Sequence, residues 1–149
     1  MKRIHLIIFS IVFLMSLLAH SSDLTPQRVQ LIYKVAKQAN IDPNDLIRIA
    51  YVESRFKVNA VRANSNGTID YGMFQINSVH WDTTCKGINV MEFKGNVRCA
   101  AKLIQQAQVH SNNDKHWIGR YHSKTHSKKV FYSKLLQNIP QVFLATTDK

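Results

Sequence analysis

The sequence has few acidic residues and almost no cysteine, and no repeat, low-complexity tract or Pro/Ser-rich linker divides it. Its 149 residues include nine Asp and Glu against 20 Lys and Arg, which gives a formal net charge of +11. Such a charge favours association with anionic polymers, of which nucleic acid, acidic lipid and the bacterial cell wall are candidates. The length and the absence of a linker predict one domain.

The N-terminal segment has the composition of a secretory signal peptide. Two basic residues precede an apolar run from Ile4 to Ala19, and small residues follow near Ser21. This run is short for a membrane span of about 20 residues, so we predict cleavage, with an uncleaved inner-membrane anchor as the alternative. We divide the chain into a signal peptide (1–21), a domain (22–140) and a tail (141–149). Export predicts a periplasmic protein and argues against nucleic acid as a partner.

Cysteine occurs only at Cys85 and Cys99. A zinc site needs four ligands, and the sequence has no CxxC or HExxH spacing, so we expect no metal and no cofactor. In an exported protein an isolated pair favours a disulfide, with two buried free thiols as the alternative. Closing a loop of this length stabilises a fold by about 3 kcal/mol if chain entropy dominates.

Helix signals dominate the rest of the chain. Thr25-Pro26 and Asp42-Pro43 each combine a capping side chain with proline at the first helical position, and apolar residues follow at helical spacing. The predicted helices span 26–39, 43–54, 96–109, a short segment after Asp114 with Trp117 and Tyr121, and 126–138. Residues 57–70 are instead rich in Asn and Gly, and Asn66-Gly67 predicts one small, irregular hairpin. The expected fold is mainly helical.

Glu53 is the strongest candidate for acid catalysis. It lies in the last turn of a predicted helix, after the mostly apolar residues 47–52. A carboxyl group in such surroundings loses hydration, which favours its neutral form and raises its pKa. A protonated carboxyl can donate a proton to a glycosidic oxygen. The alternatives are a surface glutamate and a pair with Arg55.

A second cluster of polar residues follows the predicted hairpin. Asp70 is a possible second carboxylate, as many glycosidases use two, or it simply hydrogen-bonds the turn. In Tyr71–Asn77, Gly72 permits close approach of the backbone to a ligand or another segment. Gln75 and Asn77 offer amides that suit the acetamido and hydroxyl groups of sugars.

Lysine and histidine are frequent near the C-terminal end of the domain. His122 and His126 can share a helix face, but two imidazoles do not complete a metal site. We interpret four lysines as a solvated face, with binding to the cell wall as the alternative: Lys124, Lys128, Lys129 and Lys134.

Three segments in order resemble the motifs of family 1 lytic transglycosylases. They are Glu53-Ser54, Tyr71–Asn77 and Gly119–Ser123, and the resemblance covers roughly residues 23–135. It is greatest to the small, single-domain, invasion-protein type associated with type III and type IV secretion, conjugation and pilus systems. The resemblance implies a lysozyme-like α+β fold, in which a sugar-binding cleft lies between a helical domain and a small β-hairpin.

The resemblance also implies roles for single residues. Glu53 matches the catalytic acid, Ser54 a neighbour that holds this carboxyl or a sugar group, and Tyr121 a tyrosine that approaches the acid. The third motif usually reads Ala-Tyr-Asn but here reads Arg120-Tyr121-His122, which leaves the role of His122 open. The second motif lines the cleft, and its implied substrate-binding residues are Tyr71, Gly72, Met73, Gln75 and Asn77.

The stretch from Thr68 to Ser78 is also similar to animal-type lysozymes, in which an aspartate at the place of Asp70 is the second catalytic carboxyl. Those enzymes normally carry four disulfides, whereas two cysteines form only one, which favours the bacterial family.

The favoured function is therefore a peptidoglycan lytic transglycosylase. Glu53 would cleave the β-1,4 bond between N-acetylmuramic acid and N-acetylglucosamine and leave a 1,6-anhydromuramoyl end. The alternatives are a lysozyme-type hydrolase that uses Glu53 and Asp70, and a wall-binding assembly factor without catalysis. The expected protein is a monomer whose partners are glycan strands and components of a secretion, conjugation or pilus apparatus, for which it opens the wall locally.

Overall fold

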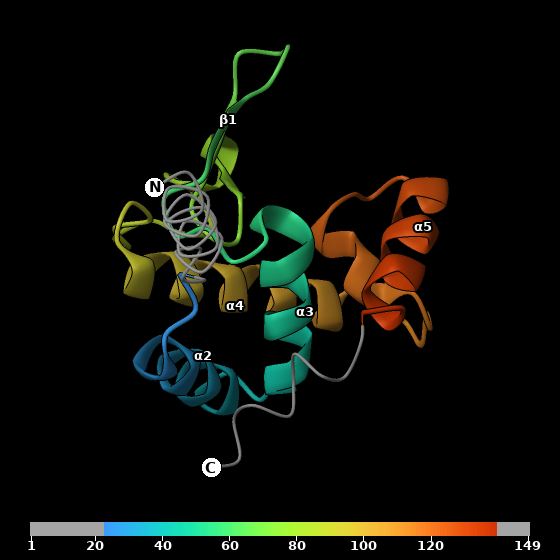
Figure 1. Ribbon diagram of the computed structural model, residues 1–149. Coiled ribbons are helices and arrows are strands. Elements are labelled where there is room, and N and C mark those ends of the chain that lie inside the picture. The colour runs from blue at the N-terminus through green and yellow to red at the C-terminus, as the bar shows by residue number, and fades with distance from the viewer. Residues whose placement is uncertain (1–22, 140–149) are drawn as a thin grey trace, which may run out of the picture.

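The computed structural model describes residues 23–139, so the predicted signal peptide and the C-terminal tail lie outside the described part. The elements in chain order are α2 (Pro26–Gln38), α3 (Pro43–Ser54), β1 (Val61–Ala63), β2 (Ile69–Tyr71), β3 (Ile76–Asn77), the 3-10 turn η1 (Ser78–His80), α4 (Phe93–Val109), the 3-10 turn η2 (Trp117–Tyr121) and α5 (His126–Gln137). The predicted mainly helical, lysozyme-like class is confirmed. Figure 1 shows the hairpin of β1 projecting from the helical body, with α2 and α5 well separated and α3 between them. Within residues 23–139, none of the helices has the length and apolar character needed to cross a membrane.

The first two helices begin where the local signals place them. The side chain of Thr25 accepts a hydrogen bond from the backbone of Arg28, and Asp42 accepts one from Asn44 at 2.9 Å. Each cap is followed by proline, whose missing N–H costs nothing at a first helical position. Helix α3 ends at Ser54 and is followed by Arg55, which has a left-handed φ of 54°. Glu53 therefore lies in the last turn of α3, as predicted.

Helix α4 begins earlier than predicted. We expected it to start near Asn96, but it starts at Phe93, after Glu92, whose side chain makes no capping hydrogen bond. Asn96 lies inside the helix and is buried. The predicted inner face of this helix is confirmed, because its apolar members are all buried: Val97, Ala100, Ala101, Ile104 and Ala107.

The core lies where α4 packs against α2 and η2, and α3 against α2 and α5. Helix α3 lies between α2 and α5 (Figure 1), and its C-terminal end meets the segment after β2, where Ser54 bonds the carbonyl of Met73. The largest fully buried side chains include Phe74, Ile32, Leu46, Ile47, Ile49 and Ile104.

The predicted hairpin is confirmed, and a third strand extends it. Strands β1 and β2 pair antiparallel, with Arg62 opposite Asp70, and β2 pairs with β3, with Asp70 opposite Asn77. The turn is closed by a bond from the backbone N–H of Asn64 to the carbonyl of Thr68. Strand β3 was not predicted, because two residues are too short to show a period.

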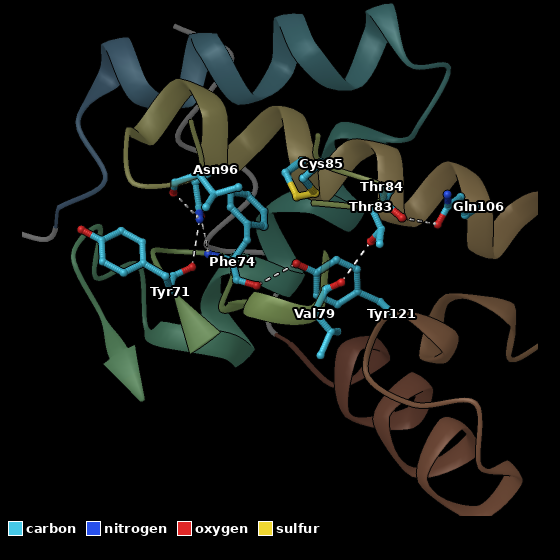
Figure 2. The surroundings of a disulfide bond; sticks show 11 residues. Tyr71, Phe74, Val79, Thr83, Thr84, Cys85, Asn96, Gln106 and Tyr121 are labelled. Carbon is cyan, nitrogen blue, oxygen red and sulfur yellow. Dashed lines mark hydrogen bonds between the residues drawn. A yellow bond between two sulfur atoms is a disulfide. The ribbon is translucent and has the colours of Figure 1, made fainter. Parts of the chain in front are cut away.

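The two cysteines form the predicted disulfide, with Cα atoms 5.3 Å apart. Figure 2 shows it joining α4 to the segment that follows η1, where the hydroxyl of Thr84 also bonds Gln106 at 3.2 Å. Both sulfur-bearing side chains are fully buried. The bridge therefore holds η1 against α4.

Candidate active site

A cleft of about 600 Å³ runs between the sheet and the helical body. It collects polar side chains from α3, the three strands, η1, η2, α5 and the connections between them, which include Glu53, Arg62, Asp70, Gln75, Asn77, His80, Tyr121, His122 and Lys128. Five of the residues predicted from the sequence thus lie together: Glu53, Asp70, Gln75, Asn77 and Tyr121. The other four predicted substrate-binding residues do not line the cleft: Ser54, Tyr71, Gly72 and Met73.

Glu53 combines partial burial with one strong hydrogen bond. The hydroxyl of Tyr132 donates to its Oε1 at 2.6 Å. Burial raises the pKa of Glu53; the bond from Tyr132 and the charge of Arg62 oppose this rise, and the charge of Asp70 adds to it. The net pKa lies above the ordinary value. The alternative pair with Arg55 is not what the structure shows, because that guanidinium lies over the ring of Tyr51.

Tyr132 bonds the candidate acid, and none of the sequence motifs pointed to it. It lies on α5, and burial followed by the charge of Glu53 raises its pKa well above the ordinary value, so it remains a donor. A signal for it existed, because the residues of α5 that are buried recur at helical spacing: Lys129, Tyr132, Ser133 and Leu136. The aromatic ring thereby enters the core while its hydroxyl reaches Glu53.

Ser54 fixes the end of α3 rather than touching the cleft. Its hydroxyl donates to the carbonyl of Met73 at 2.8 Å and also contacts the carbonyl of Ala50. The side chain of Met73 is 0% exposed and packs in the core. Our expectation that Met73 lines the cleft is therefore wrong for its side chain; its backbone carbonyl is the part that holds Ser54.

Gly72 approaches another segment, which is one of the two uses that we expected for it. Its φ is +79°, and a Cβ built there would lie 2.3 Å from the amide nitrogen of Asn96. The Asn96 amide accepts from the backbone of Phe74 at 3.0 Å and donates to the carbonyls of Tyr71 at 2.9 Å and Val90 at 3.2 Å. Figure 2 shows Asn96 reaching Tyr71 and Phe74 from α4. The second motif is thus locked to α4 through backbone atoms, including that of Tyr71.

The two amides of the second motif differ in what remains free. Gln75 donates to the carbonyls of Gly72 at 2.9 Å and Ala60 at 3.2 Å, so only its Oε1 has no partner among residues 23–139. Asn77 donates to Asp70 and Thr68 and accepts from the backbone. Gln75 can therefore accept a bond from a ligand, whereas Asn77 organises the sheet.

Asp70 is an ionised carboxylate whose oxygens are both engaged. It is 5% exposed, and its Oδ2 accepts from Arg62 at 2.7 Å and 3.1 Å, while Oδ1 accepts from Asn77 at 2.7 Å. Burial alone would raise the pKa of Asp70, but hydrogen bonds from Arg62, Asn64 and Asn77 outweigh it and lower the pKa. The contacts match the role in which Asp70 hydrogen-bonds the hairpin.

Two aromatic residues, Tyr121 and His122, line the cleft from the end of η2. The hydroxyl of Tyr121 donates to the carbonyl of Phe74 at 2.7 Å, as Figure 2 shows. The ring of His122 stacks on that of Tyr132, with centroids 4.8 Å apart and an interplanar angle of 3°. Burial, with the charges of Arg62 and Lys128, lowers the pKa of His122. A neutral imidazole thus covers the tyrosine that bonds Glu53.

The lysines do not form one solvated face as predicted. Lys129 is 8% exposed and pairs with Asp114. The carboxylate of Asp114 compensates for the hydration that the buried ammonium group loses. Lys128 lines the cleft instead. In the part of the chain that the structure describes, no three His, Cys, Asp or Glu residues are grouped so that they could hold a metal ion.

Comparison with known proteins gives one family and two groups of relatives. The family described as "Transglycosylase SLT domain" matches residues 30–123, which is more than half of the chain. Protein IpgF of Shigella flexneri is 31% identical over 64% of this chain and 66% of its own length. Lysozyme-like protein 6 of Homo sapiens is 27% identical over 46% of this chain and 55% of its own length. Lysozyme X of Drosophila melanogaster is 33% identical over 39% of this chain and 51% of its own length.

The chain thus spans about half to two thirds of the length of these relatives. No solved structure matches the chain.

Proposed function

Because the chain belongs to the transglycosylase SLT family, we propose that it is a peptidoglycan lytic transglycosylase whose catalytic acid is Glu53. The observation that supports this most directly is the state of that carboxyl. It lies in a sugar-sized cleft, its pKa is raised by burial, and one oxygen is bound by Tyr132. A carboxyl that keeps its proton near neutral pH is what cleavage of a glycosidic bond requires.

The bond from Tyr132 assigns the proton of the neutral acid. Since Oε1 accepts from Tyr132, the proton lies on Oε2. Oε2 donates it to the oxygen between C1 of N-acetylmuramic acid and N-acetylglucosamine. The C1–O bond breaks, and an oxocarbenium-like centre develops at C1. The Glu53 carboxylate then takes the proton of the C6 hydroxyl while O6 bonds C1, which closes the 1,6-anhydro ring and restores the acid without water.

The cleft stabilises each stage of this sequence. Tyr132 bonds Glu53 more strongly once the carboxyl is ionised, because charge-assisted bonds are about twice as strong as neutral ones. The free Oε1 of Gln75 can accept from the N–H of an acetamido group. Both contacts come from groups already held by the fold, so little ordering remains for the reaction.

A lysozyme-type hydrolysis is the second candidate. It is favoured by the similarity to lysozyme-like proteins and by the ionised Asp70 in the same cleft. A nucleophile needs an oxygen that is free to attack, however, and Arg62 and Asn77 occupy both oxygens of Asp70. We therefore rank the transglycosylase route first.

Mass spectrometry of the sugars released from peptidoglycan separates these routes. Anhydromuramoyl ends are expected, and reducing ends would establish hydrolysis. Glu53→Gln should abolish turnover, while Glu92→Gln, the same change at the exposed start of α4, should not. Asp70→Asn should retain most of the activity. If the Glu53→Gln variant kept more than a few per cent of the activity, Glu53 would not be the catalytic acid. If cells carrying this variant still assembled the apparatus normally, a non-catalytic wall-binding factor would be favoured.

We also propose that the enzyme acts in the periplasm and opens the wall for a secretion, conjugation or pilus apparatus. The support is the signal-like composition of residues 1–21 and the resemblance to the invasion-protein type. Fractionation of cells, with sequencing of the N-terminus of the recovered protein, tests the location. A protein found only in the cytoplasm would contradict the proposal, and one with an intact N-terminus in the inner membrane would favour the anchor.

A further inference from the structure

A second, smaller pocket of about 180 Å³ adjoins the cleft. The two spaces share three lining residues, His80, Leu103 and Tyr121, so they adjoin each other at these side chains. The mechanism proposed above makes no use of this pocket. The pocket lies beside the end of the cleft at which His80 and Tyr121 stand, next to any group attached to a sugar bound there.

The pocket is lined by basic side chains. His80 comes from η1, His110 from the C-terminal end of α4, and Arg120 and Lys124 from η2 and the loop after it. The lining contributed by residues 23–139 contains no Asp or Glu. Arg120 and Lys124 form no ion pair with any described residue. The positive charge of this pocket is therefore left without a counter-ion from the fold.

The two imidazoles of the pocket differ in what they offer to a ligand. The pKa of His80 is lowered by burial and by the charge of Lys124, so this cation acts on the pocket unopposed. The Nδ1 of His110 lies 2.6 Å from the carbonyl of Gln106 and must donate to it. With its proton on Nδ1, a neutral His110 presents Nε2 as an acceptor, so this ring does not itself bind an anion. An anionic group would pair with Arg120 and Lys124 and would favour the protonated form of His80.

The volume limits how large that group is. One water occupies about 30 Å³ of the liquid, so the pocket holds roughly six waters. This space suits a carboxylate with a few methylene groups. Peptidoglycan carries such groups on the peptide stems of its muramic acid residues, whereas its sugar hydroxyls and acetamides are neutral.

We propose that this pocket binds a carboxylate of the peptide stem, so that the enzyme prefers glycan strands that carry stems. The inference rests on the proposed function, since it assumes a muramoyl residue in the cleft.

The pocket is built before any ligand arrives. The disulfide and the bond from Thr84 to Gln106 hold η1 on α4, as Figure 2 shows. Thr83 bonds the carbonyl of Val79, the residue before His80. A site fixed in this way binds with a smaller loss of conformational freedom.

The first test compares kcat/KM on stem-bearing glycan strands and on strands stripped of stems by an amidase. The wild type should prefer the stem-bearing strands. The double variant Arg120→Gln/Lys124→Gln should reduce the ratio of the two values about tenfold. The matched control, Arg98→Gln/Lys102→Gln, removes the same charge from a separate groove on α4 and should leave the ratio unchanged. An unchanged ratio in the first variant would overturn the inference.

A binding experiment keeps the two proposals separate. The inactive Glu53→Gln protein is titrated with a disaccharide tetrapeptide, and with the same compound after amidation of its carboxylates. The acid form should raise the imidazole pKa of His80, as followed by NMR, and the amidated form should not. No response to the acid form, or an equal response to polyglutamate, would overturn the inference. A wild type inactive on both kinds of strand, with the NMR response intact, would refute the proposed catalysis alone.

Discussion

Replacing Tyr132 by Phe removes one hydroxyl from a buried ring and leaves the rest of α5 in place. The hydroxyl donates to Oε1 of Glu53 at 2.6 Å. This bond lowers the pKa of Glu53, against the larger effect of burial. Without it, the carboxyl keeps its proton to higher pH but loses a donor when it becomes ionised.

The size of the effect follows from the change in the bond during the reaction. A hydrogen bond to a charged group contributes about 1.5–3 kcal/mol and a neutral one about 0.5–1.5 kcal/mol. Glu53 is neutral before proton transfer and charged after it, so Tyr132 stabilises the transition state by roughly 1–1.5 kcal/mol relative to the bound substrate. The expected decrease in kcat is therefore about 5- to 15-fold. KM should change little, because Tyr132 is almost fully buried behind Glu53.

The assay is the pH dependence of turnover on purified glycan strands. Since the neutral acid is the active form, Tyr132→Phe should move the alkaline limb of the profile to higher pH while the plateau falls. Tyr33→Phe is the matched control, because the hydroxyl of Tyr33 bonds Asn44 away from the cleft, and it should change neither feature. An alkaline limb that stays in place or moves to lower pH would refute the role given to this bond.

Three further predictions concern stability, measured by urea unfolding. Glu53→Gln should raise the free energy of unfolding near pH 8 but leave it unchanged below pH 4.5, the ordinary pKa of the carboxyl, because a carboxyl whose pKa is raised in the folded protein destabilises the fold once it is ionised. The gain is about 1.4 kcal/mol per tenfold change in proton affinity. A difference between variant and wild type that is the same at both pH values would contradict this prediction. Gly72→Ala should cost roughly 1–3 kcal/mol more than Gly67→Ala, since both positions have a positive φ but only the first lacks room for a Cβ; equal losses would show that the overlap relaxes freely. Cys85→Ser/Cys99→Ser should lose about 3 kcal/mol, and the wild type should match it under reducing conditions.

The parts of the fold that the sequence predicts are those that depend on neighbouring residues. The caps at Thr25 and Asp42 act within one turn, and both helices begin there. Asn96 shows the limit of this reasoning. We predicted the start of a helix near this residue, but its amide bonds backbone groups of the second motif more than 20 residues away in sequence. Only the folded chain shows these partners.

Burial on α5 was harder to predict than the helix itself. Phe131 is 70% exposed, although it is more apolar than Lys129, which is buried. The helix can turn one face inward, and Tyr132 and Leu136 select the face that includes Lys129. Its charge is compensated by Asp114, which precedes η2 and lies beyond the reach of any local pattern.

In the candidate site, the sequence predicts best those properties that depend on one side chain and its neighbours along the chain. Glu53 has the raised pKa that its apolar surroundings indicated. The second motif was predicted as a lining of the cleft, yet Met73 turns into the core and Gly72 makes room for Asn96. A motif records which residues a fold needs together, and some of them serve the backbone rather than the ligand.

The hairpin has a consequence for engineering. The hydrogen bonds of its turn are mostly local: the backbone of Asn64 bonds Thr68, and the side chain of Asn66 accepts from the backbone and hydroxyl of Thr68, which also accepts from Asn77 on β3. It projects from the body in Figure 1, while Asp70 and Asn77 hold its base. The turn also lines the cleft. Because its hydrogen bonds are mostly local, we expect that it can be replaced without loss of the fold. Turns of other lengths can be transplanted onto the same two strands to change the grip on a glycan strand without disturbing the acid.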